Sequence, residues 1–260
     1  MLTDEERRTA ADRLLAAELD RVPTAPLTES WPGIDAADAY RIQLVNIERR
    51  LAAGATVRGH KVGLSSKAMQ QMMGVDEPDY GHLLADMELR PDEAVRLRDY
   101  CWPRVEVEVG FVLGADLPGE GCTEADVLAA TERVVPALEL IDSRIEDWRI
   151  GLADTIADNA SSAGFVIGEG VAPDGLDLTR IEATLYRDGE RLVAGRSDAV
   201  LGDPTTAVAW LARTVAGFGV RLKAGHLVLP GSCTRAVDVV AGSTYTADFT
   251  GLGPVALTFV

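Results

Sequence analysis

The pattern of hydrophobic and polar positions divides the chain into a helical start and a strand-rich remainder. Thr3 and Glu6 have the spacing of a helix capping box, which predicts a helix that runs to about Asp20. A second helix is predicted from about Asp35, and Gly54 is expected to end it. Its apolar residues recur at helical spacing and would form one buried stripe, namely Tyr40, Leu44, Ile47 and Leu51.

Short apolar segments alternate with glycine, proline and aspartate turns after residue 55, and this pattern is typical of strands. Asp188 and Gly189 predict a tight hairpin between two of these strands. The predicted strands are Val57–Leu64, Val105–Leu113, Val134–Ile141, Phe165–Ile167, Ile181–Tyr186, Arg191–Ala194, Leu227–Leu229, Val237–Val240, Tyr245–Phe249 and Val255–Val260. Helices are predicted between them at Lys67–Met73, Glu124–Arg133 and Thr205–Phe218.

Helices followed by a run of strands predict an α+β protein with a largely antiparallel or mixed sheet. The predicted division is an N-terminal helical region, residues 1–55, and a strand-rich region, residues 56–260. The sequence contains no repeat, low-complexity tract or clear interdomain linker. We therefore expect the two regions to form one compact unit.

The composition is that of a globular protein, with 47% hydrophobic and 25% charged residues. The net charge is −16, from 25 basic and 41 acidic residues. Such a field repels nucleic acid, so we expect no nucleic-acid partner. It is compatible with a local site for a divalent cation. An anionic substrate would need that metal, or nearby lysine and arginine side chains, to overcome the overall repulsion.

The cysteines and the first residues bear on where the protein functions. Cys101, Cys122 and Cys233 are odd in number and form no C-x-x-C motif, which argues against a disulfide framework or a structural zinc site. The charged N-terminus lacks the apolar segment of a secretion signal. No apolar run approaches the ~20 residues that span a bilayer. These features predict a cytoplasmic protein with no membrane partner.

Two glutamates alternate with valines in the segment from Arg104 to Gly110. On a strand, Glu106 and Glu108 would share one face while the valines share the other. Their positions would be about 7 Å apart, given a rise of ~3.4 Å per residue, so both carboxylates could reach one cation. Taken alone, such a pair is more often a solvated strand face.

A third glutamate, Glu139, lies within an apolar segment. Burying it there is unfavourable unless it is paired or bound to metal, and an ion pair with Arg144 or another base is the structural alternative. Three carboxylates from two strands, without histidine or cysteine, would form a hard oxygen site. That composition favours Mg²⁺ or Mn²⁺ over zinc.

Lys61 lies between Gly59 and Gly63, which indicates close approach of another backbone or of a ligand. Near a metal the pKa of Lys61 would be lowered, so that it could act as an acid or a base, or bind a substrate carboxylate. A surface lysine is nevertheless the more common case. Asp79 follows Pro78 and by itself indicates a turn.

Two segments of small polar residues are candidate ligand contacts. The hydroxyl groups of Asp158–Ser162 would orient a substrate or cap a turn. The backbone N–H groups of Gly231–Thr234 would form a nest for a carboxylate. The histidines, His60, His82 and His226, lack metal-binding spacing, and motifs of serine hydrolases, P-loops and dinucleotide folds are absent from the sequence.

Six segments, in this order, resemble the 2-keto-4-pentenoate hydratase family of the fumarylacetoacetate hydrolase superfamily. They are Gly59–Leu64, Gly74–Gly81, Val105–Val109, Pro136–Leu140, Asp158–Ser162 and Gly231–Thr234. The resemblance covers the chain from about residue 35 to its end. Each segment is a weak signal alone, whereas six in register are specific.

The resemblance implies a mixed β-roll with the N-terminal helices packed beside it, and a catalytic region at residues 56–260. It implies Mg²⁺ or Mn²⁺ held by Glu106, Glu108 and Glu139, with a small 2-oxo or 2-hydroxydienoic acid chelating the ion. Lys61 and Asp79 would be the acid/base residues. The substrate contacts would be Leu64, Ser161, Ser232 and Thr234. Members are commonly homo-oligomers in the meta-cleavage degradation of aromatic compounds or steroids.

The implied reaction is hydration of 2-hydroxypenta-2,4-dienoate, or a close analogue, to a 4-hydroxy-2-oxo acid. Decarboxylation of 2-oxo-3-hexenedioate (4-oxalocrotonate) is the alternative, although Pro78–Gly81 resembles the hydratases more. A second alternative is a non-catalytic subunit in complex with a pathway enzyme, against which the retained glutamates and Lys61 argue. His60 and Cys233 depart from the pattern of many relatives and leave the far end of the substrate open.

Overall fold

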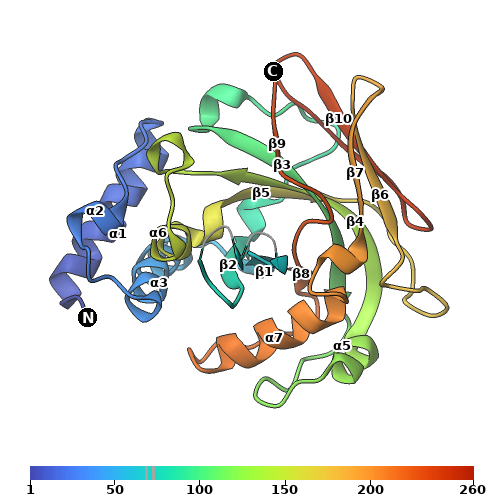
Figure 1. Ribbon diagram of the computed structural model, residues 1–260, viewed down its shortest axis with the longest axis horizontal. Helices are drawn as coiled ribbons and strands as arrows, with labels where there is room; N and C mark the ends of the chain where they lie inside the picture. Colours follow the sequence, from blue (N-terminus) through green and yellow to red (C-terminus); the bar gives the residue numbers. More distant parts are fainter. Residues whose placement is uncertain (68–69, 72–73) are drawn as a thin grey trace.

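The structure, a computed structural model, describes residues 1–67, 70–71 and 74–260. It combines helices with two sheets, so the predicted α+β class is confirmed (Figure 1). The predicted helix at Lys67–Met73 falls partly outside the described residues. The α-helices within them are α1 (Asp4–Asp20), α2 (Leu27–Ser30), α3 (Ala36–Ala52), α5 (Glu124–Ala130), α6 (Leu152–Ala157) and α7 (Pro204–Ala216).

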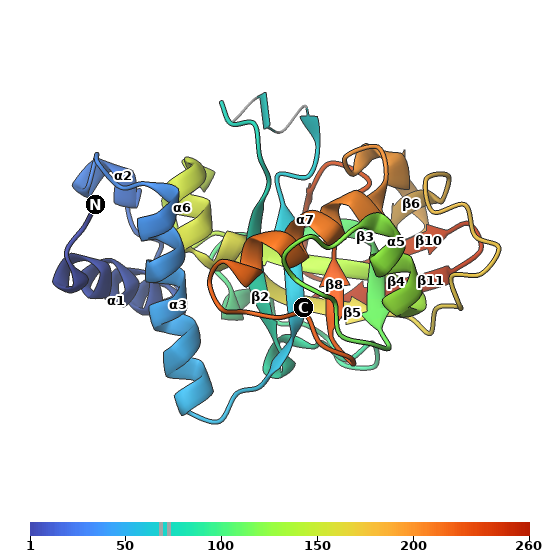
Figure 2. The ribbon, with the colours of Figure 1, turned by 90° about the horizontal axis from the view of Figure 1, so that it is seen from below.

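The N-terminal helices begin where the sequence predicts. The Glu6 N–H donates to the Thr3 hydroxyl at 3.2 Å, and the Thr3 N–H donates to the Glu6 carboxylate at 2.8 Å, which closes the capping box of α1. Asp35 caps α3 in the same way by accepting from the Asp38 N–H at 2.8 Å. Helices α1, α2, α3 and α6 lie together at one end of the molecule, beside the sheets (Figure 2).

The buried face of α3 differs from the predicted stripe. Leu51 is exposed, whereas Gln43 is buried. The Gln43 side-chain amide donates to the carbonyls of Tyr80 at 3.0 Å and Ile156 at 2.8 Å, and its oxygen lies 2.9 Å from Nδ1 of His82. A buried polar side chain with all these partners contributes to packing as an apolar one does. The spacing of hydrophobic residues in the sequence therefore could not identify the buried face of α3.

The strands form a larger, mixed sheet and a smaller, antiparallel one. The order of the larger sheet is β2-β1-β8-β3-β4-β5, with β9 also paired to β3, and the smaller sheet has the order β11-β10-β6-β7. Within the larger sheet, β1 and β8 are parallel. The strands are β1 (Val57–Gly63), β2 (Asp79–Leu84), β3 (Pro103–Leu113), β4 (Thr131–Asp142), β5 (Ser162–Ile167), β6 (Glu182–Arg187), β7 (Glu190–Arg196), β8 (Leu227–Leu229), β9 (Val237–Asp238), β10 (Thr244–Phe249) and β11 (Gly253–Thr258).

Two sequence predictions of local structure are wrong. The segment that contains Asp79 is not a turn, because Asp79 is the first residue of β2. The helix that begins at Glu124 ends at Ala130 rather than at Arg133, because β4 already begins at Thr131 and pairs with β3. In both places the strand pairing overrides the local preference of the residues.

The long strands β3 and β4 form the centre of the molecule and set the position of the site. They pair antiparallel over almost their whole length, and their apolar side chains belong to the main core. Figure 1 shows β4 bending as it crosses the molecule, so the larger sheet curls around one of its faces. Side chains on the inner face of this curl approach one another from strands that are not neighbours.

Candidate metal centre and active site

Three glutamates meet where β3 and β4 run side by side. Glu106 and Glu108 occupy alternate positions of β3 and so share one face. Glu106 is registered directly opposite Glu139 of β4. One carboxylate oxygen from each of the three lies within 4.8 Å of the others. Like charges placed opposite each other in a sheet repel, so this arrangement favours a cation between them.

Several of these carboxylate oxygens lack a hydrogen-bond partner in the protein. Glu108 and Glu139 are fully buried, and Oε1 of Glu108 and both oxygens of Glu139 have no hydrogen-bond donor. Burial raises the pKa of all three carboxyls, and the neighbouring carboxylates raise those of Glu106 and Glu108 further; the pKa of Glu106 reaches about 7. Unpartnered, converging carboxylate oxygens fit a hard divalent cation such as Mg²⁺ or Mn²⁺.

Lys61 reaches these glutamates from a distant strand. Strands β8 and β3 separate β1 from β4, which in a flat sheet would put the two about 14 Å apart. The curl instead brings Nζ of Lys61 to 3.4 Å from Oε2 of Glu139, and Nζ donates to the Ala160 carbonyl at 2.9 Å. Burial alone would lower the pKa of Lys61, but Glu139 and Glu106 raise it above its usual value. The expected lowering is absent because carboxylates surround the ammonium group.

Asp79 lies beside Lys61 in the same cavity. It pairs with Gly63 of β1, and a Cβ atom at Gly63 would lie 2.1 Å from Oδ1 of Asp79. Glycine at position 63 is therefore what makes room for the carboxyl group. Neither oxygen of Asp79 has a hydrogen-bond partner, and burial raises its pKa although the charge of Lys61 opposes the rise.

The segment Asn159–Ser161 holds the carbonyl that Lys61 contacts. Its residues have φ angles of 54°, 49° and 56°, a left-handed conformation that non-glycine residues rarely adopt. The Asn159 side chain stabilises it by accepting from the His82 N–H at 2.7 Å and donating to the His82 carbonyl at 2.9 Å. The Ser161 hydroxyl is buried without a partner and lines the cavity. This backbone strain is of the kind that is retained at functional sites.

The Gly231–Thr234 segment supports the glutamates rather than forming a free nest. The Gly231 N–H donates to Oε2 of Glu108 at 2.7 Å, and the Cys233 N–H donates to the Val107 carbonyl at 2.8 Å. The Thr234 N–H lies 3.3 Å from the Ser232 hydroxyl. These three N–H groups are thus already bonded within the protein and are not available for a substrate carboxylate.

A cavity of about 610 Å³ joins the predicted site residues. Its lining includes Lys61, Leu64, Asp79, Glu106, Ser161, Ser232 and Thr234. Leu64 has a φ of 52°, another left-handed residue beside the cavity. Glu108 and Glu139 do not line the cavity themselves. They lie next to two residues that do, Glu106 and Lys61. The structure therefore brings the predicted residues together, while their roles stay predictions.

Sequence reasoning missed part of the cavity wall. Arg104 lies two residues before Glu106 on the same face of β3, so strand periodicity could have included it. Arg235 directly follows the small-residue segment Gly231–Thr234. The apolar wall comes partly from irregular backbone between β4 and α6, where no hydrophobic period exists. Trp148 and Ile150 come from that segment, whereas Ile141, also in the wall, lies near the end of β4.

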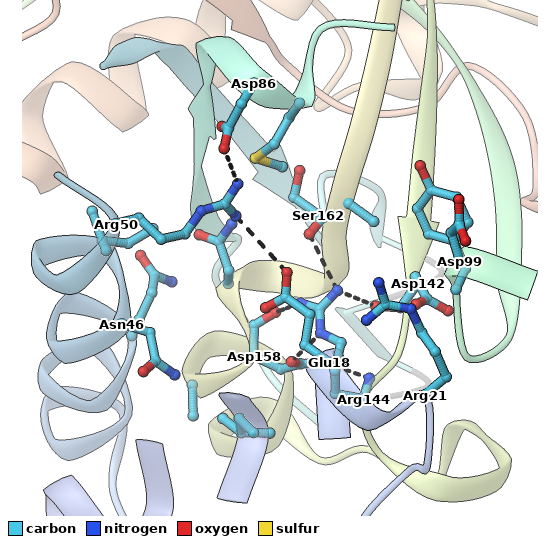
Figure 3. Close-up of a pocket in the computed structure, with 18 residues that line it drawn as sticks. Glu18, Arg21, Asn46, Arg50, Asp86, Asp99, Asp142, Arg144, Asp158 and Ser162 are labelled. Carbon is cyan, nitrogen blue, oxygen red and sulfur yellow. Dashed lines mark hydrogen bonds and ion pairs between the residues drawn. The ribbon is translucent and has the colours of Figure 1, made fainter. Parts of the chain in front are cut away.

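A second cavity, of about 220 Å³, lies between the N-terminal helices and the sheet (Figure 3). Its central pair is Arg144 and Asp158, with Nε of Arg144 2.6 Å from Oδ1 of Asp158. The same guanidinium donates to the carbonyls of Asp142 and Asp158, and Asp142 accepts from two backbone N–H groups. Arg144 is thus occupied here and does not pair with Glu139. The base that lies beside Glu139 is Lys61, as the alternative of an ion pair with another base expects.

The histidines and cysteines take no part in a metal site. The tilted rings of His60 and His82 lie with their centroids 4.7 Å apart, and neither residue lines the larger cavity. Glu106, Glu108 and Glu139 form the one group of potential metal ligands found among the described residues. Cys233 does line the cavity, and all three cysteines are free thiols. Of the two sequence departures noted above, only Cys233 therefore lies where a substrate could reach it.

Residues 52–260 match the family model described as "Fumarylacetoacetate (FAA) hydrolase C-terminal". The chain belongs to the fumarylacetoacetate hydrolase family. Two relatives are similar over nearly the whole chain. The "2-keto-4-pentenoate hydratase" of Paraburkholderia xenovorans is 44% identical over 99% of this chain and 96% of the relative. The "2-oxo-hept-4-ene-1,7-dioate hydratase" of Escherichia coli is 41% identical over 96% of both chains.

A solved structure of this family shows the same fold. The 4-oxalocrotonate decarboxylase of Pseudomonas putida G7, complexed with magnesium and adipate, is similar to this chain with a TM-score of 0.96 and 34% identity. The alignment covers 100% of this chain and 99% of that one. The predicted mixed β-roll with N-terminal helices packed against it is thereby confirmed.

Proposed function

We propose that this chain is a metal-dependent hydratase. It adds water to 2-hydroxypenta-2,4-dienoate, or to a close analogue, and yields a 4-hydroxy-2-oxo acid in the catabolism of aromatic compounds or steroids. The observation that carries the proposal is the convergence of three glutamates, two of them with carboxylate oxygens that lack a hydrogen bond, beside a buried lysine whose Nζ lies 3.4 Å from Glu139. The 44% identity to a hydratase over nearly the full chain supports the same reaction.

Glu106, Glu108 and Glu139 would hold the ion, Mg²⁺ or Mn²⁺. When bound, the ion would polarise the 2-oxo group of the substrate and stabilise the negative charge that develops on it. The three carboxylates would fill part of the coordination shell of the ion. The remaining ligand positions would be open to water and substrate oxygens in the cavity.

The reaction first moves a proton from the 2-hydroxyl group to C5, which gives a 2-oxo-3-enoate. Water then adds its oxygen to C4 and a proton to C3. Lys61 suits the donation of a proton because its pKa is raised and it remains an ammonium group. Asp79 suits proton exchange because burial raises its pKa above that of an ordinary carboxyl. We assign the proton transfers to these two residues, and substrate contacts to Leu64, Ser161, Ser232 and Thr234.

The test is turnover of 2-hydroxypenta-2,4-dienoate with Mg²⁺ or Mn²⁺, followed as loss of ultraviolet absorbance. The Glu106→Gln variant should lose activity while it keeps its fold, because an amide is a poorer ligand for a hard cation. Glu132→Gln on the exposed part of β4 is the matched control. Wild-type activity in Glu106→Gln would remove the metal assignment.

Decarboxylation of 2-oxo-3-hexenedioate is the second candidate, because a decarboxylase shares this fold at 34% identity. Release of CO₂ from that acid, without hydration of the dienoate, would replace the hydratase proposal. A non-catalytic subunit of a pathway complex remains the third reading, and silence with both substrates would favour it. The complete set of buried site residues supports an active enzyme.

The assembly and location of the protein are also proposals. We infer a homo-oligomer in the cytoplasm, without nucleic acid or membrane partners, from the family resemblance and the net charge of −16. Within the part of the chain that the structure describes, no helix has both the length and the apolar character needed to cross a bilayer. Light scattering of the purified protein measures its oligomeric state directly.

A further inference from the structure

The cavity is much larger than a five-carbon acid requires. Its volume of about 610 Å³ lies within the range of about 300–1,000 Å³ that holds drug-sized ligands. Lys61 and Asp79 are buried and mark its closed end, where the reaction takes place. Arg235 is exposed and marks its open end. A substrate that reacts at the closed end therefore leaves space between the reacting atoms and the mouth.

Part of the cavity wall is apolar. Ile141 is buried there, and Ile150 and Trp148 are half-buried. Side chains of this type favour a hydrocarbon segment over water. This part of the wall therefore suits the carbon chain of a longer substrate rather than another polar group.

Two arginines lie on the open part of the wall, and they differ in their partners. Nε of Arg104 lies 2.8 Å from Oδ1 of Asp238, and its guanidinium stacks on Trp148 at 4.3 Å from the ring centroid. By contrast, no ion pair or hydrogen bond of the Arg235 guanidinium occurs among the described residues. Arg104 is thus held in place by the protein, and Arg235 has its donors available.

The backbone around Arg235 explains why it is displaced toward the mouth. The Cys233 N–H bonds to the Val107 carbonyl, and Val237 pairs with Val105. Residues 234–236 therefore bulge out opposite Glu106 alone. Such bulges redirect side chains beside active sites. Arg235 lies next to Glu106 in this register, but no ion pair joins the two among the described residues, and Arg235 is exposed where it lines the cavity.

We propose that Arg235 binds a second carboxylate, at the far end of the substrate, and that this hydratase prefers 2-hydroxydienoic diacids of six or seven carbons. The inference rests on the proposed function and specifies its substrate class. A second carboxylate would be repelled by the net charge of −16 unless a local cation received it. Guanidinium is the side-chain group best suited to that contact, because its N–H donors match a carboxylate.

The test compares two substrates, 2-hydroxypenta-2,4-dienoate and 2-hydroxyhepta-2,4-diene-1,7-dioate, in the full-length, Mg²⁺-loaded enzyme. The wild type should show a higher kcat/KM for the diacid. In Arg235→Gln the ratio of kcat/KM for diacid over monoacid should fall by about tenfold or more, chiefly through KM. Arg235→Lys should retain part of the preference because it keeps the charge. Arg191→Gln, which removes the same charge from an exposed position on β7, should leave the ratio unchanged.

Inhibition separates binding from chemistry. 2-Oxopentanoate and 2-oxoheptanedioate lack the double bond and cannot be hydrated. The inhibition constant of the diacid alone should rise in Arg235→Gln. Equal weakening of both inhibitors would place Arg235 at the reacting end and overturn the inference, as would a lysine variant no better than glutamine. Hydration of the monoacid but not of the diacid would also overturn it and leave the proposed function intact. Hydration of neither would instead remove the proposed function.

Discussion

Two cavities lie on either side of the segment Asn159–Ser161. Both contain buried carboxylates and a buried cationic side chain, but they differ in whether these groups have hydrogen-bond partners. In the smaller one, the buried Arg144 donates to Asp158 and to three backbone carbonyls (Figure 3). In the larger one, buried carboxylate oxygens of Glu108 and Glu139 have no donor. Because folding normally satisfies buried polar groups, the unsatisfied set marks the place where a ligand completes the structure.

The comparison predicts that replacing the cationic side chain affects activity in the larger cavity and stability in the smaller one. In the larger cavity, Lys61→Met should reduce kcat by about 10²–10⁴-fold, because it removes the proposed proton donor. The fold should survive, since the methionine side chain fills the same space. Steady-state kinetics together with thermal unfolding of the same sample measure both quantities. A variant that is fully active would sink the assignment of Lys61.

In the smaller cavity the corresponding change should affect stability. Arg144→Met leaves Asp158 buried without its partner, which should lower the free energy of unfolding by about 3–5 kcal/mol. Chemical denaturation of the metal-free protein measures this change. The double variant Arg144→Met/Asp158→Asn should recover part of the loss because no unpaired charge remains. A stability unchanged from wild type would contradict the structural role of this pair.

A carboxylate of the larger cavity should show the opposite sign. In the metal-free protein, Glu108→Gln should raise the free energy of unfolding by on the order of 1 kcal/mol, the size of a typical single-residue effect. The amide replaces a carboxyl group whose pKa is raised by burial and by Glu139, so folding no longer has to protonate it, while the amide oxygen can still accept from the Gly231 N–H. Added Mg²⁺ should stabilise the wild type but not this variant. Destabilisation in the absence of metal would show that Glu108 is structural.

The smallest expected effect is a dependence on pH. The pKa of Glu106 is about 7 in the folded protein, above its usual value of 4.5, so its contribution to stability is complete below 4.5 and is lost as the pH rises through 7. Without metal, the Tm should fall by a few degrees between about pH 6 and about pH 8, since one kcal/mol corresponds to about 2–4 °C in a chain of this size.

Two controls isolate this contribution. Mg²⁺ should stabilise the protein more at the higher pH, where protons no longer compete for the carboxylates, and Glu106→Gln should weaken both trends. Burial lowers the pKa of His60, so this residue destabilises the folded protein as the pH falls below its usual value of 6.5. Its effect on the Tm therefore lies mostly below the range of about pH 6–8. A Tm that rises with pH in the metal-free wild type would contradict the arrangement.

Local signals predicted the elements that depend on local rules. The capping box at Thr3 and the hairpin at Asp188 are set by neighbouring residues, and both occur as expected. The convergence of Glu106 and Glu108 follows from strand alternation alone. Their meeting with Glu139 required a register between two strands, which one sequence does not contain and which the family resemblance supplied.

The features that escaped prediction depend on contacts between distant segments. Asp79 resembles a turn residue locally, and β2 forms because it pairs with β1. The distance between Lys61 and Glu139 results from the curl of the whole sheet. The open guanidinium of Arg235 depends on a bulge opposite Glu106, and the sequence around it contains no signal for that bulge.

Gln43 of α3 links the N-terminal helices to the larger sheet, so the two parts cannot be exchanged independently. One amide from α3 holds carbonyls of β2 and α6 and meets the ring of His82, which in turn is bonded to the segment that faces Lys61. A chimaera that takes its first 55 residues from another family member should therefore keep its activity only if the donor carries an equivalent amide at this position. The helical region therefore supports the larger cavity, although none of its residues lines that cavity.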